Sequence, residues 1–187
     1  MKRLIASKET GLTIILIVLS IIVWQKNPQF MSATNLGNLA QLVGLYGIFS
    51  IGLGLIIITG GIDLSVGSVF ALLGVLLSLA LVKWKWPPVL AVAAALAFSS
   101  FLGYLHGALI TRVKLQPFIV TLCGLLIYRG LARFIANDNS MGFGTGEGFE
   151  WLKSFATGRL FGIPTSFVVM LVIAVLAAIL LHRSVYG

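Results

Sequence analysis

The sequence predicts an all-α protein whose helices cross a membrane about six times. Hydrophobic residues make up 59% of its 187 residues, and its mean hydropathy is +1.07. Only 10% of the residues are charged, against about 25% in a typical soluble domain. This composition excludes a soluble enzyme and a disordered chain. The single cysteine, Cys123, excludes a disulfide scaffold.

The predicted spans come from stretches that are nearly free of charge. A bilayer-spanning helix needs about 20 mostly apolar residues, so six helices use roughly 120 residues and leave no room for a separate soluble domain. The connection 137–163 is polar and glycine-rich, and it is expected to be a flexible loop in water on the outer side. The six predicted helices lie near residues 10–25, 38–59, 65–82, 88–110, 118–136 and 164–181.

The first predicted helix has a second interpretation. Lys2, Arg3 and Lys8 precede a short apolar run, as in a secretory signal. No cleavage site of the small-x-small type follows Trp24, which favours a retained helix.

Basic residues in short loops predict the orientation of the helices. An inward N-terminus gives a weak excess of basic residues inside, so the prediction of a cytoplasmic N-terminus rests mainly on the N-terminal cluster. The inner set is Lys2, Arg3, Lys8, Arg112, Lys114 and Arg183, and the outer set is Lys26, Lys83, Lys85, Lys153 and Arg159.

Small residues recur every fourth position on the fourth predicted helix. This spacing places them on one helix face, where they allow another backbone to approach closely. The pattern predicts helix packing rather than chemistry. The residues are Ala91, Ala95, Ser99, Gly103 and Gly107. His106 is adjacent to this stripe and is expected to be a satisfied interfacial side chain.

A polar break separates the second and third predicted helices at residues 59–68. Gly60 and Gly61 can end one helix with positive φ angles, and Asp63 or Ser65 can cap the next, with Gly67 continuing a small-residue face. The favoured interpretation is a capped turn at the inner surface, because an acid at depth is costly. The alternative is a helix break that lines a polar cavity, as transporters use at substrate sites.

Two arginines share a face of the fifth predicted helix at i, i+4. Arg129 lies roughly 17 Å along the helix axis from Phe118, past the midplane. It is expected either to extend to the outer interface or to face the bundle and pair with an acid or a helix C-terminus. Arg133 is expected to be an interfacial anchor.

Motifs for several other functions are not found in the sequence. It has no phosphate-binding glycine loop, no metal-ligand spacing and no nucleophile elbow. Its basic residues are scattered at helix ends and give no nucleic-acid footprint. The sequence therefore predicts no catalytic residues, cofactor or metal.

Two stretches resemble signature blocks of the permeases of monosaccharide ABC importers, the ribose, xylose, arabinose and galactoside group. The blocks match in order and separation. The chain resembles only the N-terminal half, because such permeases continue past the position of Gly187 with a segment that docks on the ATPase. His106 and Cys123 depart from the usual Asn and Gly. The blocks are Gly60-Gly61-Ile62-Asp63-Leu64-Ser65-Val66-Gly67-Ser68 and Pro117-Phe118-Ile119-Val120-Thr121-Leu122 with Tyr128-Arg129-Gly130-Leu131.

The resemblance implies a permease subunit of the bacterial inner membrane that works by alternating access and is not itself an enzyme. The implied partners are a second permease subunit, a cytoplasmic ATP-binding cassette ATPase and a soluble or lipoprotein sugar-binding protein. A neutral sugar needs hydrogen-bonding groups along its path, and the candidates are Asn38, Gln41, Tyr46, Ser50, Thr121, Tyr128 and Arg129.

Three alternatives remain open at this point. The cargo can be another small polar metabolite, such as a nucleoside or a furanone. The protein can be an ion-coupled secondary transporter with Asp63 as the ion site, although no inverted repeat is found. The chain can also be a structural subunit or a truncated, non-functional permease fragment.

Overall fold

A computed structural model describes residues 8–145 and 147–183, and it is mainly helical. The predicted all-α class is confirmed. Lys2, Arg3 and residues 184–187, which entered the predictions of orientation and ATPase docking, lie outside the described residues. The helices are α2 (Lys8–Lys26), η1 (Pro28–Met31), α3 (Ala33–Ile58), α4 (Val66–Ser78), η2 (Leu79–Lys83), α5 (Pro88–Thr111), α6 (Pro117–Ala136), α7 (Glu150–Thr157) and α8 (Thr165–Arg183).

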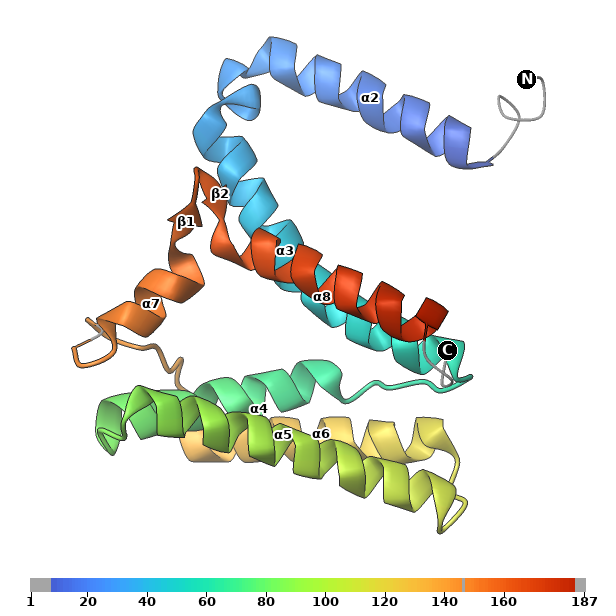
Figure 1. The fold of residues 1–187 in the computed structure, drawn as a ribbon, viewed down its shortest axis with the longest axis vertical. Coiled ribbons are helices and arrows are strands. Elements are labelled where there is room, and N and C mark those ends of the chain that lie inside the picture. The colour runs from blue at the N-terminus through green and yellow to red at the C-terminus, as the bar shows by residue number, and fades with distance from the viewer. Residues whose placement is uncertain (1–7, 146, 184–187) are drawn as a thin grey trace.

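Five helices in the described ranges are long and apolar enough to cross a membrane, with α4 and η2 forming one continuous span. The apolar part of α2, Thr10–Lys26, is shorter. Helix α3 begins at Ala33, earlier than predicted, because the Ser32 side chain accepts a hydrogen bond from the Asn35 N–H and caps it. Successive spans run back and forth, so the α3–α4 and α5–α6 connections lie on one side of the molecule and the α4–α5 turn lies on the other (Figure 1).

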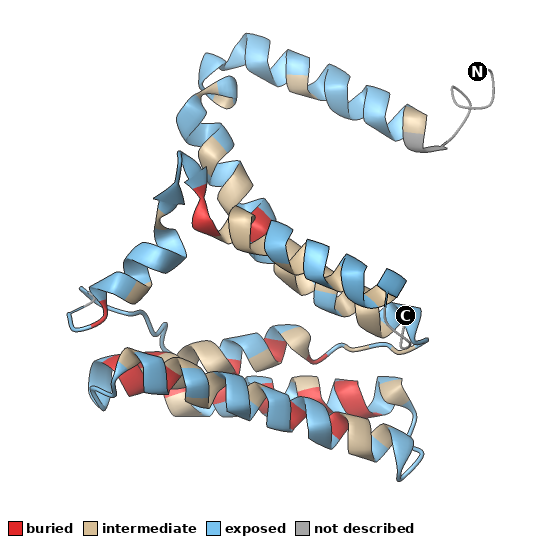
Figure 2. Cartoon of the chain, in the orientation of Figure 1, coloured by how far each residue is buried: buried red, intermediate tan, exposed pale blue. Residues whose placement is uncertain are grey.

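The helices form two packed groups, α3 with α8 and α4 with α5 and α6 (Figure 1). Helices α3 and α8 meet where Gly44 faces the backbone of Ser166 and Phe167, and the Ser166 hydroxyl donates to the Gln41 carbonyl over 3.1 Å. Most buried residues belong to the second group (Figure 2). Its core is Leu72, Leu102, Tyr128 and Ala132.

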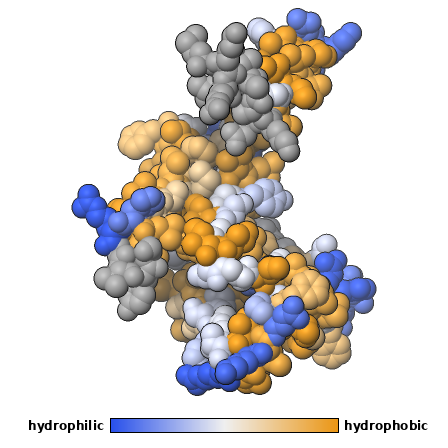
Figure 3. All heavy atoms as spheres, turned by 90° about the vertical axis from the view of Figure 1, so that its right-hand side faces the viewer, coloured by the Kyte–Doolittle hydropathy of each residue, from blue (hydrophilic) through white to orange (hydrophobic). Residues whose placement is uncertain are grey.

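Large hydrophobic side chains are exposed along the spans, as expected for helices that face lipid. Hydrophobic residues also cover much of the face in Figure 3, while the hydrophilic residues gather in separate clusters. Helix α2 extends away from the other spans (Figure 1), and its residues from Gly11 to Lys26 are mostly exposed.

The segment 137–163 is more ordered than the predicted flexible loop. It contains α7, and the strands β1 (Arg159–Leu160) and β2 (Ile163–Pro164) pair in antiparallel order beside it. The Ser78 hydroxyl donates to the Gly142 carbonyl over 2.7 Å, and Phe149 is buried against Ala80, Leu81 and Ala91. These contacts order the segment because they fasten it to the ends of α4 and α5.

Only part of the small-residue stripe of α5 is packed against other described residues. Ala91 is buried, but a Cβ added at Gly103 or Gly107 would meet no described atom within 4 Å. The buried face of α5 instead carries Leu102 and His106. Close packing at the glycines therefore stays a prediction.

Candidate functional site

The break between α3 and α4 begins with a left-handed glycine. Gly60 has φ +76°, whereas Gly61 does not have a positive φ. Only one of the two predicted glycines therefore has the left-handed conformation. Residues 61–65 then run without regular structure until α4 begins at Val66. This extended stretch gives a side chain at position 63 access to the interior of the helix group.

Asp63 and Ser65 together order the start of α4. The Asp63 Oδ1 accepts hydrogen bonds from the N–H and the hydroxyl of Ser65, each over 2.7 Å. Ser65 is buried at 1% exposure, and its carbonyl accepts from the Ser68 N–H at 2.9 Å and the Ser68 hydroxyl at 2.7 Å. Ser65 is the cap residue by position, but the side-chain acceptor at this end is Asp63. Of the two predicted caps, Asp63 therefore supplies the side-chain acceptor, and the Ser65 side chain makes no capping hydrogen bond to α4.

The break reaches into the helix group. The Ile62 carbonyl accepts a hydrogen bond from the Thr121 hydroxyl over 3.3 Å, one turn inside the start of α6. Asp63 and His106 line one cavity, which is described below. His106 lies about 8 Å along the helix axis from the C-terminal end of α5, so the cavity extends inward from that end. The break is thus capped and also lines a cavity whose wall is mostly apolar. Its position at the inner surface and its use as a substrate site stay predictions. Gly67 is exposed, with open space where a Cβ would stand.

A cavity of about 300 Å³, called the helix-break cavity below, lies at this break, where the two helix groups meet. The Phe49 ring of α3 and the Phe70 ring of α4 form an edge-to-face pair with centroids 4.9 Å apart. Apolar and aromatic side chains make most of the wall, and a few polar groups interrupt it. The lining residues are Phe49, Asp63, Ser65, Val66, Val69, Phe70, Leu73, Ser99, Leu102, Gly103 and His106.

His106 is held in the cavity wall from behind. Its Nε2 and the Tyr128 hydroxyl are hydrogen-bonded over 2.9 Å, and the two rings stack with centroids 5.6 Å apart. Gly124 leaves room for the imidazole, since a Cβ there would lie 2.7 Å from Nε2. The sequence predicted a satisfied histidine. It gave no sign that Asp63 shares a cavity with Ser99 and His106, because that proximity depends on how the break packs against α5.

The other predicted path residues are not gathered at this cavity. Thr121 is buried and bonds to the Ile62 and Pro117 carbonyls. Tyr46 is 64% exposed, and the Ser50 hydroxyl donates to the Tyr46 carbonyl within α3. Arg129 is exposed among the described residues, so both of its predicted orientations stay predictions. A path along Tyr46, Ser50 and Arg129 remains a prediction.

Arg133, the predicted interfacial anchor, forms an ion pair with Asp138 just beyond the end of α6. The Nε–Oδ1 distance is 2.6 Å, and both side chains are about two-thirds exposed. Such an exposed pair contributes about 1 kcal/mol or less to stability.

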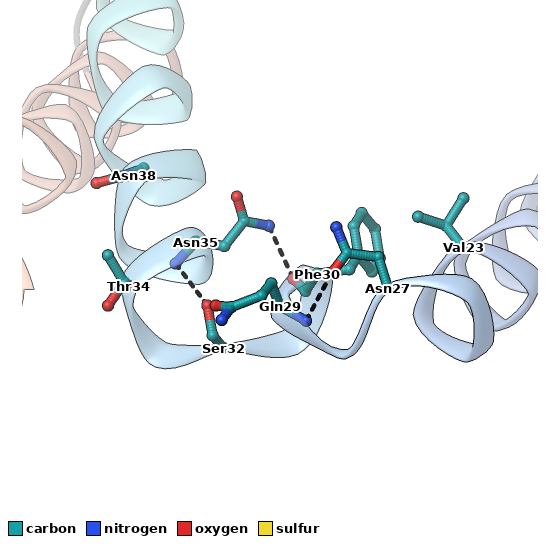
Figure 4. Close-up of a pocket in the computed structure, with 8 residues that line it drawn as sticks. All are labelled: Val23, Asn27, Gln29, Phe30, Ser32, Thr34, Asn35 and Asn38. Carbon is teal, nitrogen blue, oxygen red and sulfur yellow. Dashed lines mark hydrogen bonds between the residues drawn. The ribbon is translucent and has the colours of Figure 1, made fainter.

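A second cavity, of about 320 Å³, lies at the α2–α3 corner (Figure 4). Amide and hydroxyl side chains line it, but several of them hold the corner together. Asn27 Oδ1 accepts from the Gln29 N–H, and the Asn35 amide donates to the Phe30 carbonyl. This cavity is therefore explained by local turn structure, including the candidate Asn38 in its wall.

Comparisons with known proteins place the chain among transport proteins. The family model described as "Branched-chain amino acid transport system / permease component" matches residues 35–187. The ribose import permease protein RbsC of Bacillus subtilis (strain 168) is 36% identical over 178 residues, which cover 95% of this chain and 53% of that protein. No solved structure matches the chain significantly.

Two further relatives have comparable coverage. The ribose import permease protein RbsC of Escherichia coli (strain K12) is 34% identical over 174 residues, covering 93% of this chain and 54% of the relative. The fructose import permease protein FruF of Bifidobacterium longum (strain NCC 2705) is 34% identical over 200 residues, which cover 100% of this chain and 55% of that protein. The chain thus spans about half the length of the curated relatives it matches.

Proposed function

Because the chain belongs to the family of branched-chain amino acid transport system permease components, we propose that it forms part of the translocation path of an ATP-driven importer. The observation that carries this proposal is the family match over residues 35–187, which includes every residue around the helix-break cavity. Under this proposal residues 1–187 contribute to a transmembrane domain and catalyse no reaction themselves.

The proposed cargo is a monosaccharide or a similar small polar solute. Three relatives carry names that specify ribose or fructose import. A cavity of about 300 Å³ is at the small end of the range for ligand pockets, about 300–1,000 Å³. Its mixture of aromatic rings with a few hydroxyl, imidazole and carboxylate groups fits a neutral solute that has both C–H and O–H surface.

The proposed mechanism is alternating access. Relative movement of the α3–α8 group and the α4–α6 group would open and close the cavity between them, because Phe49 and Phe70 stand at their junction. A ligand shifts such an equilibrium only by its differential affinity for the two states. ATP binding and hydrolysis on a partner therefore provide the directional drive.

The proposed partners are the proteins that this mechanism requires besides the permease itself. They are a second permease subunit, an ATP-binding cassette ATPase on the cytoplasmic side, and a soluble or lipoprotein binding protein that delivers the solute. The proposed location is the bacterial inner membrane with a cytoplasmic N-terminus. The multiple apolar helices support a multi-pass membrane protein.

Co-purification and ATP turnover test the proposal. The permease, produced at its full genomic length, should co-purify with an ATP-binding cassette ATPase. In proteoliposomes with the binding protein, ribose or fructose should stimulate ATP turnover. Failure to associate with any such ATPase would remove the proposal.

Asp63 gives a second candidate function its specific support, because an acid within a membrane bundle is often an ion site. In an ion-coupled transporter, uptake should stop when ionophores dissipate the proton and sodium gradients, and Asp63→Asn should abolish ion coupling. ATP-driven uptake that continues with ionophores would dismiss this candidate.

A further inference from the structure

We propose that the helix-break cavity is a binding site for one neutral monosaccharide, in which Asp63 accepts hydrogen bonds from the sugar's hydroxyl groups. The inference rests on the proposed function and deepens it. It assigns part of the importer's solute selectivity to the permease itself and not only to the protein that delivers the sugar.

The Asp63 carboxylate is fixed in orientation but only half occupied. Its Oδ1 is engaged by the N–H and hydroxyl of Ser65, and no hydrogen bond from another described residue reaches Oδ2. No lysine or arginine is among the residues that line the cavity. A carboxylate without a cationic partner makes its strong hydrogen bonds to donors such as O–H groups. It repels anionic solutes, so sugar phosphates and sugar acids are disfavoured.

Helix α5 supplies a second set of polar groups to the cavity wall. The Ser99 hydroxyl donates to the Leu96 carbonyl over 2.9 Å, which leaves its oxygen free to accept a hydrogen bond. The His106 imidazole is fixed through Nε2 by Tyr128. Polar groups from two segments of one cavity wall can distinguish the orientation of hydroxyl groups on a ring, because a wrong epimer leaves a partner unsatisfied.

Aromatic rings complete the site. Phe49 and Phe70 present ring edges and faces at the junction of the helix groups, and Val69 and Leu102 extend the apolar surface. A sugar ring has an apolar C–H face that packs on such a surface, while its hydroxyl groups bind the polar side. The volume of about 300 Å³ accommodates one sugar ring.

The position of the site couples binding to the proposed movement. Asp63 and Phe70 belong to the α4–α6 group, and Phe49 belongs to α3. A bound sugar therefore touches both groups, and its affinity must change when they move apart. This difference in affinity is what allows a solute to bias alternating access.

The test uses the permease–ATPase complex in detergent without the soluble binding protein, and D-ribose as the probe. Saturation-transfer NMR should detect ribose binding that saturates. Asp63→Asn should weaken it at least about tenfold, equivalent to about 1.4 kcal/mol. The matched control Asp138→Asn, which removes an exposed carboxylate outside the cavity, should bind ribose like the parent protein. Ribose 5-phosphate should not compete.

A second variant guards against misfolding of Asp63→Asn. Phe70→Leu keeps an apolar side chain at a half-exposed position and should also weaken ribose binding. Equal ribose binding in the parent, Asp63→Asn and Phe70→Leu proteins would overturn the inference, as would the absence of binding by the parent. Binding that requires sodium would also overturn it and would favour an ion site.

Sugar-stimulated ATP turnover separates failure of this inference from failure of the proposed function. If turnover is stimulated by ribose while the isolated permease–ATPase complex binds no ribose, the importer function stands and the cavity site is wrong. If no sugar stimulates turnover in the complete system, the proposed function itself fails.

Discussion

The Tyr128 hydroxyl and the His106 Nε2 lie 2.9 Å apart and join α6 to α5 behind the wall of the helix-break cavity. Both residues are buried, at 9% exposure each. The bond fixes the imidazole that lines the cavity, because a buried polar group without a partner is costly. It also links two helices that otherwise meet through apolar side chains such as Leu102 and Ala132.

Removing the Tyr128 hydroxyl should destabilise the helix group. Tyr128→Phe leaves His106 Nε2 unpaired, so we expect the free energy of unfolding to fall by about 1–3 kcal/mol. Unfolding in mixed micelles with an increasing proportion of SDS measures this free energy. Tyr104→Phe on α5, where the tyrosine is exposed, is the control and should change little. Equal losses for the two variants would show that the hydrogen bond is not formed.

A methyl group at Gly124 should displace the His106 ring. The added Cβ would lie 2.7 Å from Nε2 and 2.8 Å from Cε1. Overpacking of this kind costs about 1–3 kcal/mol, again measured as the free energy of unfolding. Gly130→Ala on the same helix is the matched control, since no described atom lies within 4 Å of its Cβ position. It should be neutral or stabilising because alanine favours a helix.

The α3–α8 pair should separate when Gly44 gains a side chain. A Cβ there would overlap the backbone of Ser166 and Phe167, whereas at Gly52 it would meet open space. In a Cys123→Ser background, cysteines introduced by Gln41→Cys and Ser166→Cys should form a disulfide readily. Gly44→Ala should reduce the yield of this cross-link severalfold, and Gly52→Ala should leave it unchanged. An unchanged yield in both would contradict the packing.

The segment 137–163 should loosen when Ser78 loses its hydroxyl. Ser78→Ala removes the hydrogen bond to the Gly142 carbonyl, worth about 1 kcal/mol, so local opening becomes about fivefold more frequent. Hydrogen exchange of residues 140–145 should accelerate accordingly. Ser100→Ala removes only a bond within α5, to the Leu96 carbonyl, and should not affect these amides. Acceleration in both variants would indicate a general loss of stability.

The spans and the class of fold were accessible from sequence because the membrane imposes local rules. About 20 apolar residues make a span, and polar stretches separate spans, so a prediction such as 88–110 lies close to α5, Pro88–Thr111. The capping role of Asp63 and the left-handed Gly60 also follow from local chemistry. The order within 137–163 was missed because it depends on Ser78 and Phe149, whose contacts join residues distant in sequence.

The sequence alone determined that this chain has membrane-spanning helices, approximately where the long apolar helices lie, and that the stretch 59–68 interrupts them. Tertiary structure decided which polar groups meet at that interruption. Asp63 comes from the break and Ser99 and His106 come from α5, and the packing of α4 against α5 and α6 brings these two segments to one cavity. The physical reason is that hydrophobicity and helix capping act between near neighbours in sequence, whereas a binding site depends on contacts between helices, which small features such as Gly124 control.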